Sequence, residues 1–308
     1  MESIIGGPYM DQAEKLRSMV KSQEETVKEP AKRLARVITV TSGKGGVGKS
    51  SLAINLALQF RKKGKSVIIF DADFGLANIE VMFGAIPKYN LADMIFRGKG
   101  FKDIIVEGPE GIGFISGGSG INGLGNMNRE QVQYLVYKLK ELEMLADIII
   151  IDTGAGISDS VLEFVAASGE VVLVTTPEPT SITDSYALLK ALNARESFDA
   201  EICKIKVVAN RVLNYEEGKN LFSKLEVVVT KFLKINLAFL GVIPMDMNMS
   251  KAIMQQKPIS IAYPNSAGAK SVERIADGLL ENKEAEGPKR NSLARAVANI
   301  IKNGFKNK

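Results

Sequence analysis

The stretch TSGKGGVGKSS, residues 41–51, decides the fold. It follows the β-branched run RVITVT and precedes SLAINLALQFRKKG, whose apolar spacing predicts an amphipathic helix. Between a strand and a helix, the pattern G-x-x-x-x-G-K-[ST] predicts a phosphate-binding loop, because its glycines let backbone N–H groups surround an anion at the helix N-terminus. The residues predicted to surround the phosphates are Gly43, Lys44, Gly45, Gly46, Val47, Gly48, Lys49, Ser50 and Ser51.

Carboxylates follow two other apolar runs. Asp152 ends IIIID, and Asp71 and Asp73 end VIIFDAD. The carboxyl ends of parallel strands border the crevice where ligands bind in open α/β sheets, so these side chains are expected beside the phosphates. We expect Lys49 to reach the β- and γ-phosphates, and the predicted ligands of Mg²⁺ are Ser50, Asp71 and Asp152.

From Arg36 onward, short apolar runs alternate with helical patterns. The runs predicted to be strands are RVITVT, SVIIFDAD, ADIIIIDTG, EVVLVTT, IKVVANRV and LAFLGVIP. The helices predicted between and after them, besides the one that follows the glycine loop, are at about 129–145, 158–168, 180–196, 215–233 and 266–280. Continuous apolar strands joined by helices predict a doubly wound α/β fold, with a mostly parallel sheet and helices on both faces.

The composition excludes several kinds of chemistry. The chain of 308 residues has one cysteine and no histidine, so it has no disulfide framework, no histidine base and no CxxC metal site. Neither a secretory signal nor a membrane span is expected, which predicts a cytoplasmic protein. Six basic residues and no acidic one follow Gly287, so the net charge of +5 belongs to the tail, and no nucleic-acid partner is expected.

The motifs KGGVGKS, DADFGLAN and DTGAG resemble those of the deviant Walker A ATPases, the MinD/ParA class, over residues 36–280. The resemblance implies ATP and Mg²⁺ as cofactors, and a dimer that forms when ATP binds. It also implies that Lys44 crosses to the partner's phosphates and that Asp73 positions the attacking water. By the same resemblance the adenine site contains Asn210, Arg211 and Pro244.

The N-terminal segment DQAEKLR, residues 11–17, resembles a motif of the FlhG family, the MinD-like regulators of flagellar number also called YlxH or FleN. The resemblance implies that this helix binds the GTPase FlhF and stimulates it, and that flagellar C-ring proteins are further partners. Read without the resemblance, the segment is a helix capped by Asp11, with Glu14 completing a capping box. The implied contact residues are Asp11, Gln12, Ala13, Leu16 and Arg17.

The C-terminal segment NSLARAVANIIKNGFKNK has apolar residues on one helical face and basic residues on the other, which predicts a helix lying on a membrane surface. A last helix packed on the domain is the alternative. The apolar residues are Leu293, Val297, Ile300, Ile301 and Phe305. The ATP-bound dimer would pair two such helices, so peripheral membrane attachment at the cytoplasmic leaflet is expected in that form.

The predicted domains are an N-terminal extension, residues 1–34, an ATPase domain, residues 35–281, and a linker with the membrane helix, residues 282–308. Met10 is an alternative start. Three other functions remain open at this point. They are division-site placement or chromosome partitioning by an ATPase of the same class, iron–sulfur transfer on the same fold, and nucleotide binding with negligible hydrolysis.

Overall fold

A computed structural model gives the structure, and it describes residues 34–73, 78–117, 129–281 and 299. The chain divides into two units, residues 1–33 and 34–308, and the described fold lies in the second. It begins at Leu34 and its last helix ends at Glu281.

An eight-stranded sheet crosses the domain in the order β3-β4-β2-β5-β1-β6-β7-β8. Every neighbouring pair is parallel except β3 and β4, which pair antiparallel at one edge. The strands are β1 (Arg36–Ser42), β2 (Val67–Ala72), β3 (Val106–Glu107), β4 (Gly113–Ser116), β5 (Ile148–Ala155), β6 (Glu170–Thr175), β7 (Lys204–Val212) and β8 (Leu237–Pro244). The predicted mostly parallel, doubly wound sheet is confirmed.

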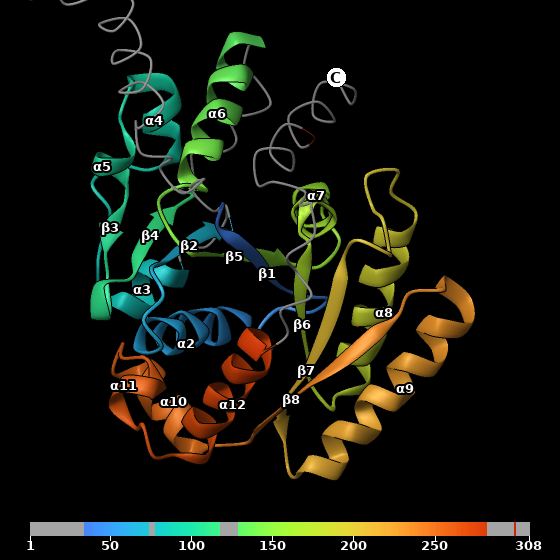
Figure 1. Ribbon diagram of the computed structural model, residues 1–308. Helices are drawn as coiled ribbons and strands as arrows, with labels where there is room; N and C mark the ends of the chain where they lie inside the picture. Colours follow the sequence, from blue (N-terminus) through green and yellow to red (C-terminus); the bar gives the residue numbers. More distant parts are fainter. Residues whose placement is uncertain (1–33, 74–77, 118–128, 282–298, 300–308) are drawn as a thin grey trace, which may run out of the picture. The chain divides into compact units, whose positions relative to one another are not determined.

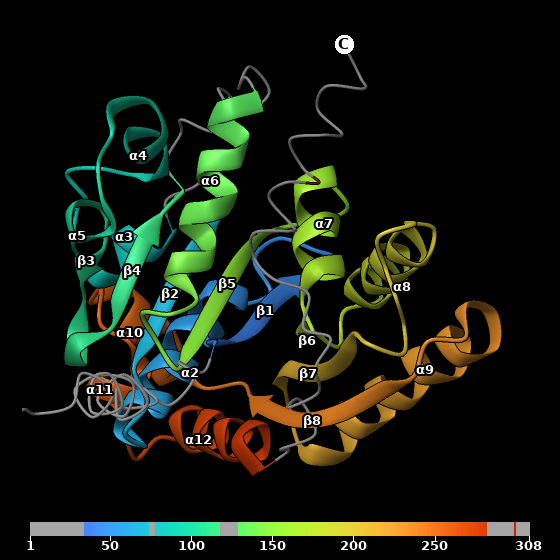
Figure 2. The ribbon, with the colours of Figure 1, turned by 45° about the horizontal axis from the view of Figure 1, so that its top comes forward.

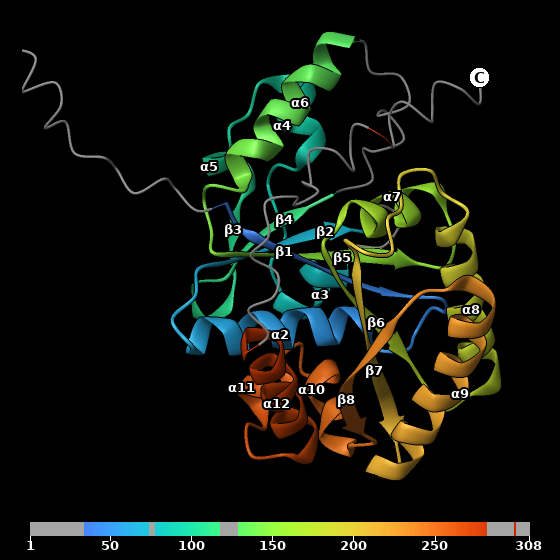
Figure 3. The same ribbon diagram turned by 45° about the vertical axis from the view of Figure 1, so that its right-hand side comes forward.

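Helices cover both faces of this sheet (Figure 1). Helix α2 and the C-terminal helices α10 to α12 lie on one face, whereas α6 and α7 lie on the other (Figures 2 and 3). The helices are α2 (Lys49–Lys62), α3 (Asn78–Phe83), α4 (Leu91–Arg97), α5 (Phe101–Ile104), α6 (Arg129–Leu142), α7 (Asp159–Ala167), α8 (Pro179–Asn193), α9 (Tyr215–Leu233), α10 (Met247–Met254), α11 (Ile259–Ala262) and α12 (Ala267–Glu281), with a short 3-10 turn, Pro109–Gly111.

Burial of the central strands explains their continuous apolar sequence. In β5 the successive residues Ile149 and Ile150 are both fully buried, although they point to opposite faces. Ile149 packs in the cluster with α4 and α6, and Ile150 packs in the cluster with α2 and α12. A strand between two helical layers therefore needs apolar side chains on both faces.

The strand order places the glycine loop at the centre of the carboxyl edge. Strand β1 lies between β5 and β6, and the loop that follows it leads directly into α2. The chain leaves β1 through α2 toward β2 on one side, whereas it leaves the neighbouring strand β6 through α8 toward β7 on the other. This is the arrangement that opens a ligand crevice in doubly wound folds. Among the described residues, no helix is long and apolar enough to cross a membrane.

Candidate active site

Glycines give the phosphate loop its shape. Gly46 and Gly48 have φ angles of 76° and 94°, in the left-handed region that favours glycine. Gly43 is needed for a different reason, because a Cβ there would lie 2.2 Å from the backbone carbonyl of Asp184 in α8. The loop ends at the start of α2, whose first turn has neither a side-chain cap nor an acidic residue. This helix N-terminus can therefore bind an anion.

Lys49 is held beside the carboxylate that ends β5. Its Nζ lies 2.7 Å from Asp152 Oδ1 and 3.4 Å from Ser50 Oγ, and the residue is only 7% exposed. Asp152 is completely buried. The ammonium is thus within the loop, and the predicted grouping of Lys49, Ser50 and Asp152 is present.

Asp71 lies directly beside Asp152, as Cα partners in the register of β2 and β5. Asp71 Oδ1 accepts a hydrogen bond from the backbone N–H of Asp73. Burial, followed by the charge of Asp152, raises the pKa of Asp71 to about 8. Burial also raises the pKa of Asp152, and the ammonium of Lys49 opposes that rise.

These two carboxylates fit a divalent cation. In the part of the chain that the structure describes, Asp71 Oδ2 and Asp152 Oδ2 are buried with no hydrogen-bond partner. Buried polar atoms are nearly always paired, and carboxylate and hydroxyl oxygens are the ligands that Mg²⁺ prefers. Together with the hydroxyl of Ser50 and the phosphates of a nucleotide, they would hold Mg²⁺.

Asp73 lies over the end of β5. Its Oδ1 would be 3.6 Å from a Cβ built on Gly154, an ordinary contact distance, so the carboxylate lies directly against this glycine. Asp73 is the last described residue before 74–77. The structure therefore brings it to the same edge as Asp71 and Asp152, where the sequence predicted it.

Lys44 points away from the loop toward the first turn of α8. Its Nζ lies 2.6 Å from Glu178 Oε2 and 2.8 Å from Thr180 Oγ1. The lysine side chain is 36% exposed and that of Glu178 is 54% exposed. The ion pair lowers the pKa of Glu178. Lys44 thus has acceptors within its own chain, contacts that the sequence did not predict.

The residues predicted to surround adenine meet at the ends of β7 and β8. Asn210 and Ile243 are Cα partners, and Val212 pairs with Pro244 in the same way. Arg211, between them, has a φ of 58° and an exposed side chain. The backbone N–H of Met245 then bonds the carbonyl of Val212, which closes this corner.

Some predicted site residues lie elsewhere. The hydroxyl of Ser51 faces the sulfur of Met249 in α10, at 3.4 Å, so only its backbone remains in the first turn beside the phosphates. The predicted FlhF-binding and membrane-binding residues lie outside the described ranges. They are Asp11, Gln12, Ala13, Leu16 and Arg17, and Leu293, Val297, Ile300, Ile301 and Phe305.

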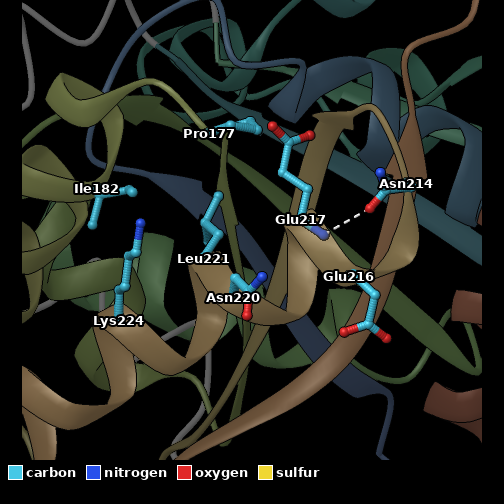
Figure 4. Close-up of a pocket in the computed structure, with 8 residues that line it drawn as sticks. All are labelled: Pro177, Ile182, Asn214, Glu216, Glu217, Asn220, Leu221 and Lys224. Carbon is cyan, nitrogen blue, oxygen red and sulfur yellow. Dashed lines mark hydrogen bonds between the residues drawn. The ribbon is translucent and has the colours of Figure 1, made fainter.

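A cavity of about 450 Å³ lies between α8 and α9 (Figure 4). Ile182 and Leu221 form its apolar wall, and Lys224 lies on the α9 side. Asn214 caps α9 at this cavity by accepting the backbone N–H of Glu217 at 2.9 Å. None of the residues that line this cavity belongs to the phosphate loop.

Comparison with solved structures shows the same fold. The cell division ATPase MinD of Pyrococcus furiosus superimposes with a TM-score of 0.63, at 23% identity, covering 80% of this chain and 99% of that one. MinD of Pyrococcus horikoshii, complexed with Mg-ADP, also gives a TM-score of 0.63 at 23% identity, covering 82% of this chain and 98% of that one.

Residues 33–280 match the family model described as "ParA: NUBPL iron-transfer P-loop NTPase". Iron transfer does not fit this chain. Its one cysteine, Cys203, is buried, and burial raises the pKa of the thiol to about 12, so it offers no accessible thiolate for an iron–sulfur cluster.

Two sequence relatives are more similar than the MinD structures. The antiactivator FleN of Pseudomonas aeruginosa is 40% identical over 241 residues, which are 78% of this chain and 85% of FleN. The flagellum site-determining protein YlxH of Helicobacter pylori is 35% identical over 254 residues, 82% of this chain and 84% of YlxH. The phosphate loop, the paired carboxylates, the fold and these similarities agree: the chain belongs to the ParA/MinD family of P-loop ATPases.

Proposed function

We propose that this ATPase is a dimerising switch that regulates the number and placement of flagella. The supporting observation is the ranking of its relatives. Identity is 40% to the antiactivator FleN and 35% to the flagellum site-determining protein YlxH. It is 28% and 29% to the septum site-determining MinD proteins of Arabidopsis thaliana and Synechocystis.

The genetic test is deletion of the gene in its own organism, with flagella counted per cell by electron microscopy. The proposal expects an altered number or position, restored by the native gene and not by a Lys49→Ala variant. Division-site placement would instead give displaced septa, and chromosome partitioning would give anucleate cells with normal flagella. Either of these outcomes contradicts the flagellar assignment.

In the proposed cycle, ATP and Mg²⁺ bridge two protomers, and Lys44 leaves Glu178 to contact the partner's phosphates. The long side chain of Lys44 is partly exposed, so its ammonium can move from Glu178 to another acceptor without a change in the loop backbone. A water-excluded interface would strengthen the attraction between its ammonium and the charge that develops on the phosphates. Hydrolysis, with Asp73 orienting the water, would then dissolve the dimer.

The N-terminal segment is proposed to act on FlhF. A helix containing Gln12 could order the attacking water in a GTPase site, as polar side chains do in other GTPases. FlhF GTP turnover should therefore rise with a peptide covering residues 10–30, and deletion of residues 1–34 should abolish the effect of the full chain. A Gln12→Ala peptide is the matched control. Absence of stimulation by the native peptide would remove this part of the proposal.

The C-terminal segment is proposed to attach the ATP-bound dimer to the membrane, so the protein would be cytoplasmic and only peripherally membrane-bound. Its support is the sequence pattern of apolar and basic faces. Sedimentation with vesicles that contain anionic lipid should require both ATP and residues 282–308. An Ile300→Asp variant should stay in the supernatant, and its continued sedimentation would contradict the membrane role. Flagellar C-ring proteins are proposed as further partners.

A further inference from the structure

Asn210 touches the phosphate loop itself. Its Nδ2 donates a hydrogen bond of 2.7 Å to the carbonyl oxygen of Val47, which precedes Gly48 in the loop. The two residues are 163 positions apart in the chain, and Asn210 is only 8% exposed. A buried amide of strand β7 therefore bonds the backbone of the loop just before α2 begins.

The orientation of this amide is fixed from both ends. Asn210 Oδ1 accepts the backbone N–H of Arg211 at 2.9 Å, at the irregularity in β7 where Arg211 has a φ of 58°. With the oxygen engaged there, the NH₂ group must face the loop. A Cβ added to Gly48 would lie 2.4 Å from Asn210 Nδ2, so the amide packs directly against Gly48 and leaves no room for a side chain there.

This contact determines where the next N–H points. In a planar trans peptide the carbonyl of Val47 and the N–H of Gly48 point in opposite directions. When Asn210 holds the carbonyl on its own side, the N–H of Gly48 faces the other way. Donors that are fixed before a charged ligand arrives bind it with less reorganisation.

The amide can also contact a base at the same time. An asparagine side chain has two N–H donors and an oxygen with two lone pairs. Val47 and Arg211 use one of each, which leaves one N–H and one lone pair. A donor beside an acceptor is the pattern with which asparagine pairs with an adenine edge.

We propose that Asn210 is a positioning residue for the phosphate loop, in addition to the base contact that the family resemblance implies. It would hold the Val47 carbonyl outward, direct the Gly48 N–H toward the phosphates, and link the adenine end of the nucleotide to the phosphate end. This inference rests on ATP binding at the loop and extends it.

The test is to remove the base from the ligand. Inorganic tripolyphosphate with Mg²⁺ has no base, so a residue that only reads adenine cannot affect its binding. Calorimetric titration of the full chain would compare the native protein, Asn210→Ala and the matched control Asn214→Ala. Asn214 lies just after the end of β7 and caps α9, so its loss removes an asparagine without touching the phosphate loop.

Asn210→Ala is expected to raise the Kd of tripolyphosphate roughly ten-fold, as the loss of a buried hydrogen bond would. It should also speed amide hydrogen exchange in residues 46–49 without ligand, and Asn214→Ala should change neither. Asn210→Ser, which keeps a polar atom in the buried position, serves if the alanine variant unfolds.

An unchanged Kd for tripolyphosphate in Asn210→Ala would overturn the proposal, whether or not ATP binding weakens. No measurable binding of tripolyphosphate by the native chain would also overturn it, because the loop would not be preorganised. Failure of the native chain to bind ATP is a separate result, and it would contradict the ATPase assignment itself.

Discussion

Lys44 Nζ lies 2.6 Å from Glu178 Oε2, so the first of the two lysines of the phosphate loop is ion-paired to the start of α8 in its own chain. Thr180 provides a second acceptor in the first turn of that helix. Both partners of the ion pair are partly exposed, and an exposed pair of this kind is weak and easily exchanged. The pair is therefore suited to hold Lys44 until a stronger anion, such as a partner's triphosphate, replaces the carboxylate.

Glu178→Gln should favour dimerisation, because Lys44 no longer has a charged acceptor in its own chain. We expect the dimer fraction at subsaturating ATP to rise roughly two- to five-fold, and the difference to shrink in added salt, which screens exposed ion pairs. Sedimentation velocity with ATP and Mg²⁺ measures both effects. Glu216→Gln on α9 is the matched charge control. Equal dimer fractions in both variants would show that Glu178 does not compete with the partner's phosphates for Lys44.

Asp73→Ala should lower steady-state phosphate release at least about a hundred-fold, the usual effect of losing a group that directs water. ATP binding should persist, because Asp73 lies over Gly154 and outside the loop that surrounds the phosphates. Asp277→Ala, which removes a partly exposed carboxylate of α12 that is ion-paired to Lys63, is the control. An unchanged rate of phosphate release in Asp73→Ala would show that another residue positions the attacking water.

Asp71→Asn should change how stability depends on pH. Burial raises the pKa of Asp71 to about 8 in the folded chain, from an ordinary value of 3.8, so the folded form binds the proton more tightly than the unfolded form. Between these two values the contribution of this carboxyl group to stability falls as pH rises, by an amount on the order of a few kcal/mol.

Thermal unfolding of the native chain from pH 5 to pH 8, without nucleotide or Mg²⁺, should therefore show a decreasing Tm relative to Asp71→Asn. The same substitution should weaken Mg²⁺-dependent ATP binding, because it replaces a carboxylate oxygen by an amide. Parallel Tm curves for the two proteins would show that Asp71 is not the titrating group.

Gly43→Ala should impair the loop far more than Gly45→Ala. The new methyl group at position 43 would lie 2.2 Å from the backbone of Asp184, whereas at position 45 the nearest atom, Ala155 Cβ, is 4.0 Å away. We expect ATP affinity to fall at least about ten-fold more in Gly43→Ala, since α8 must move to accept the methyl. Nucleotide titration of the two folded variants decides this, and similar losses would contradict the packing argument.

Much of this fold could be predicted from the sequence. The six strands with continuous apolar runs are present, because strands buried on both faces have a composition that few other elements share. Strands β3 and β4 and the short helices α3 to α5 were not predicted. Their runs are brief and interrupted by glycines, and their pairing at the sheet edge depends on contacts distant in sequence.

The site was predictable where a motif fixes both residue type and position. Lys49 and Ser50 at the start of α2 meet Asp71 and Asp152 near the carboxyl ends of β2 and β5, as the motifs predicted. The Lys44–Glu178 and Asn210–Val47 contacts were not predictable. Each joins residues more than a hundred positions apart through a side-chain orientation that only the packed structure determines.

The dimer mechanism is tested most directly by Lys44→Ala, followed by light scattering coupled to gel filtration with ATP and Mg²⁺. Both proteins carry Asp73→Ala, which slows hydrolysis. The protein that keeps Lys44 should form a dimer. Lys44→Ala should remain a monomer while its ATP affinity stays within about five-fold of the native value, because Lys49 and the loop N–H groups are intact. A Lys44→Ala protein that dimerises as fully as its parent would show that the lysine does not cross the interface.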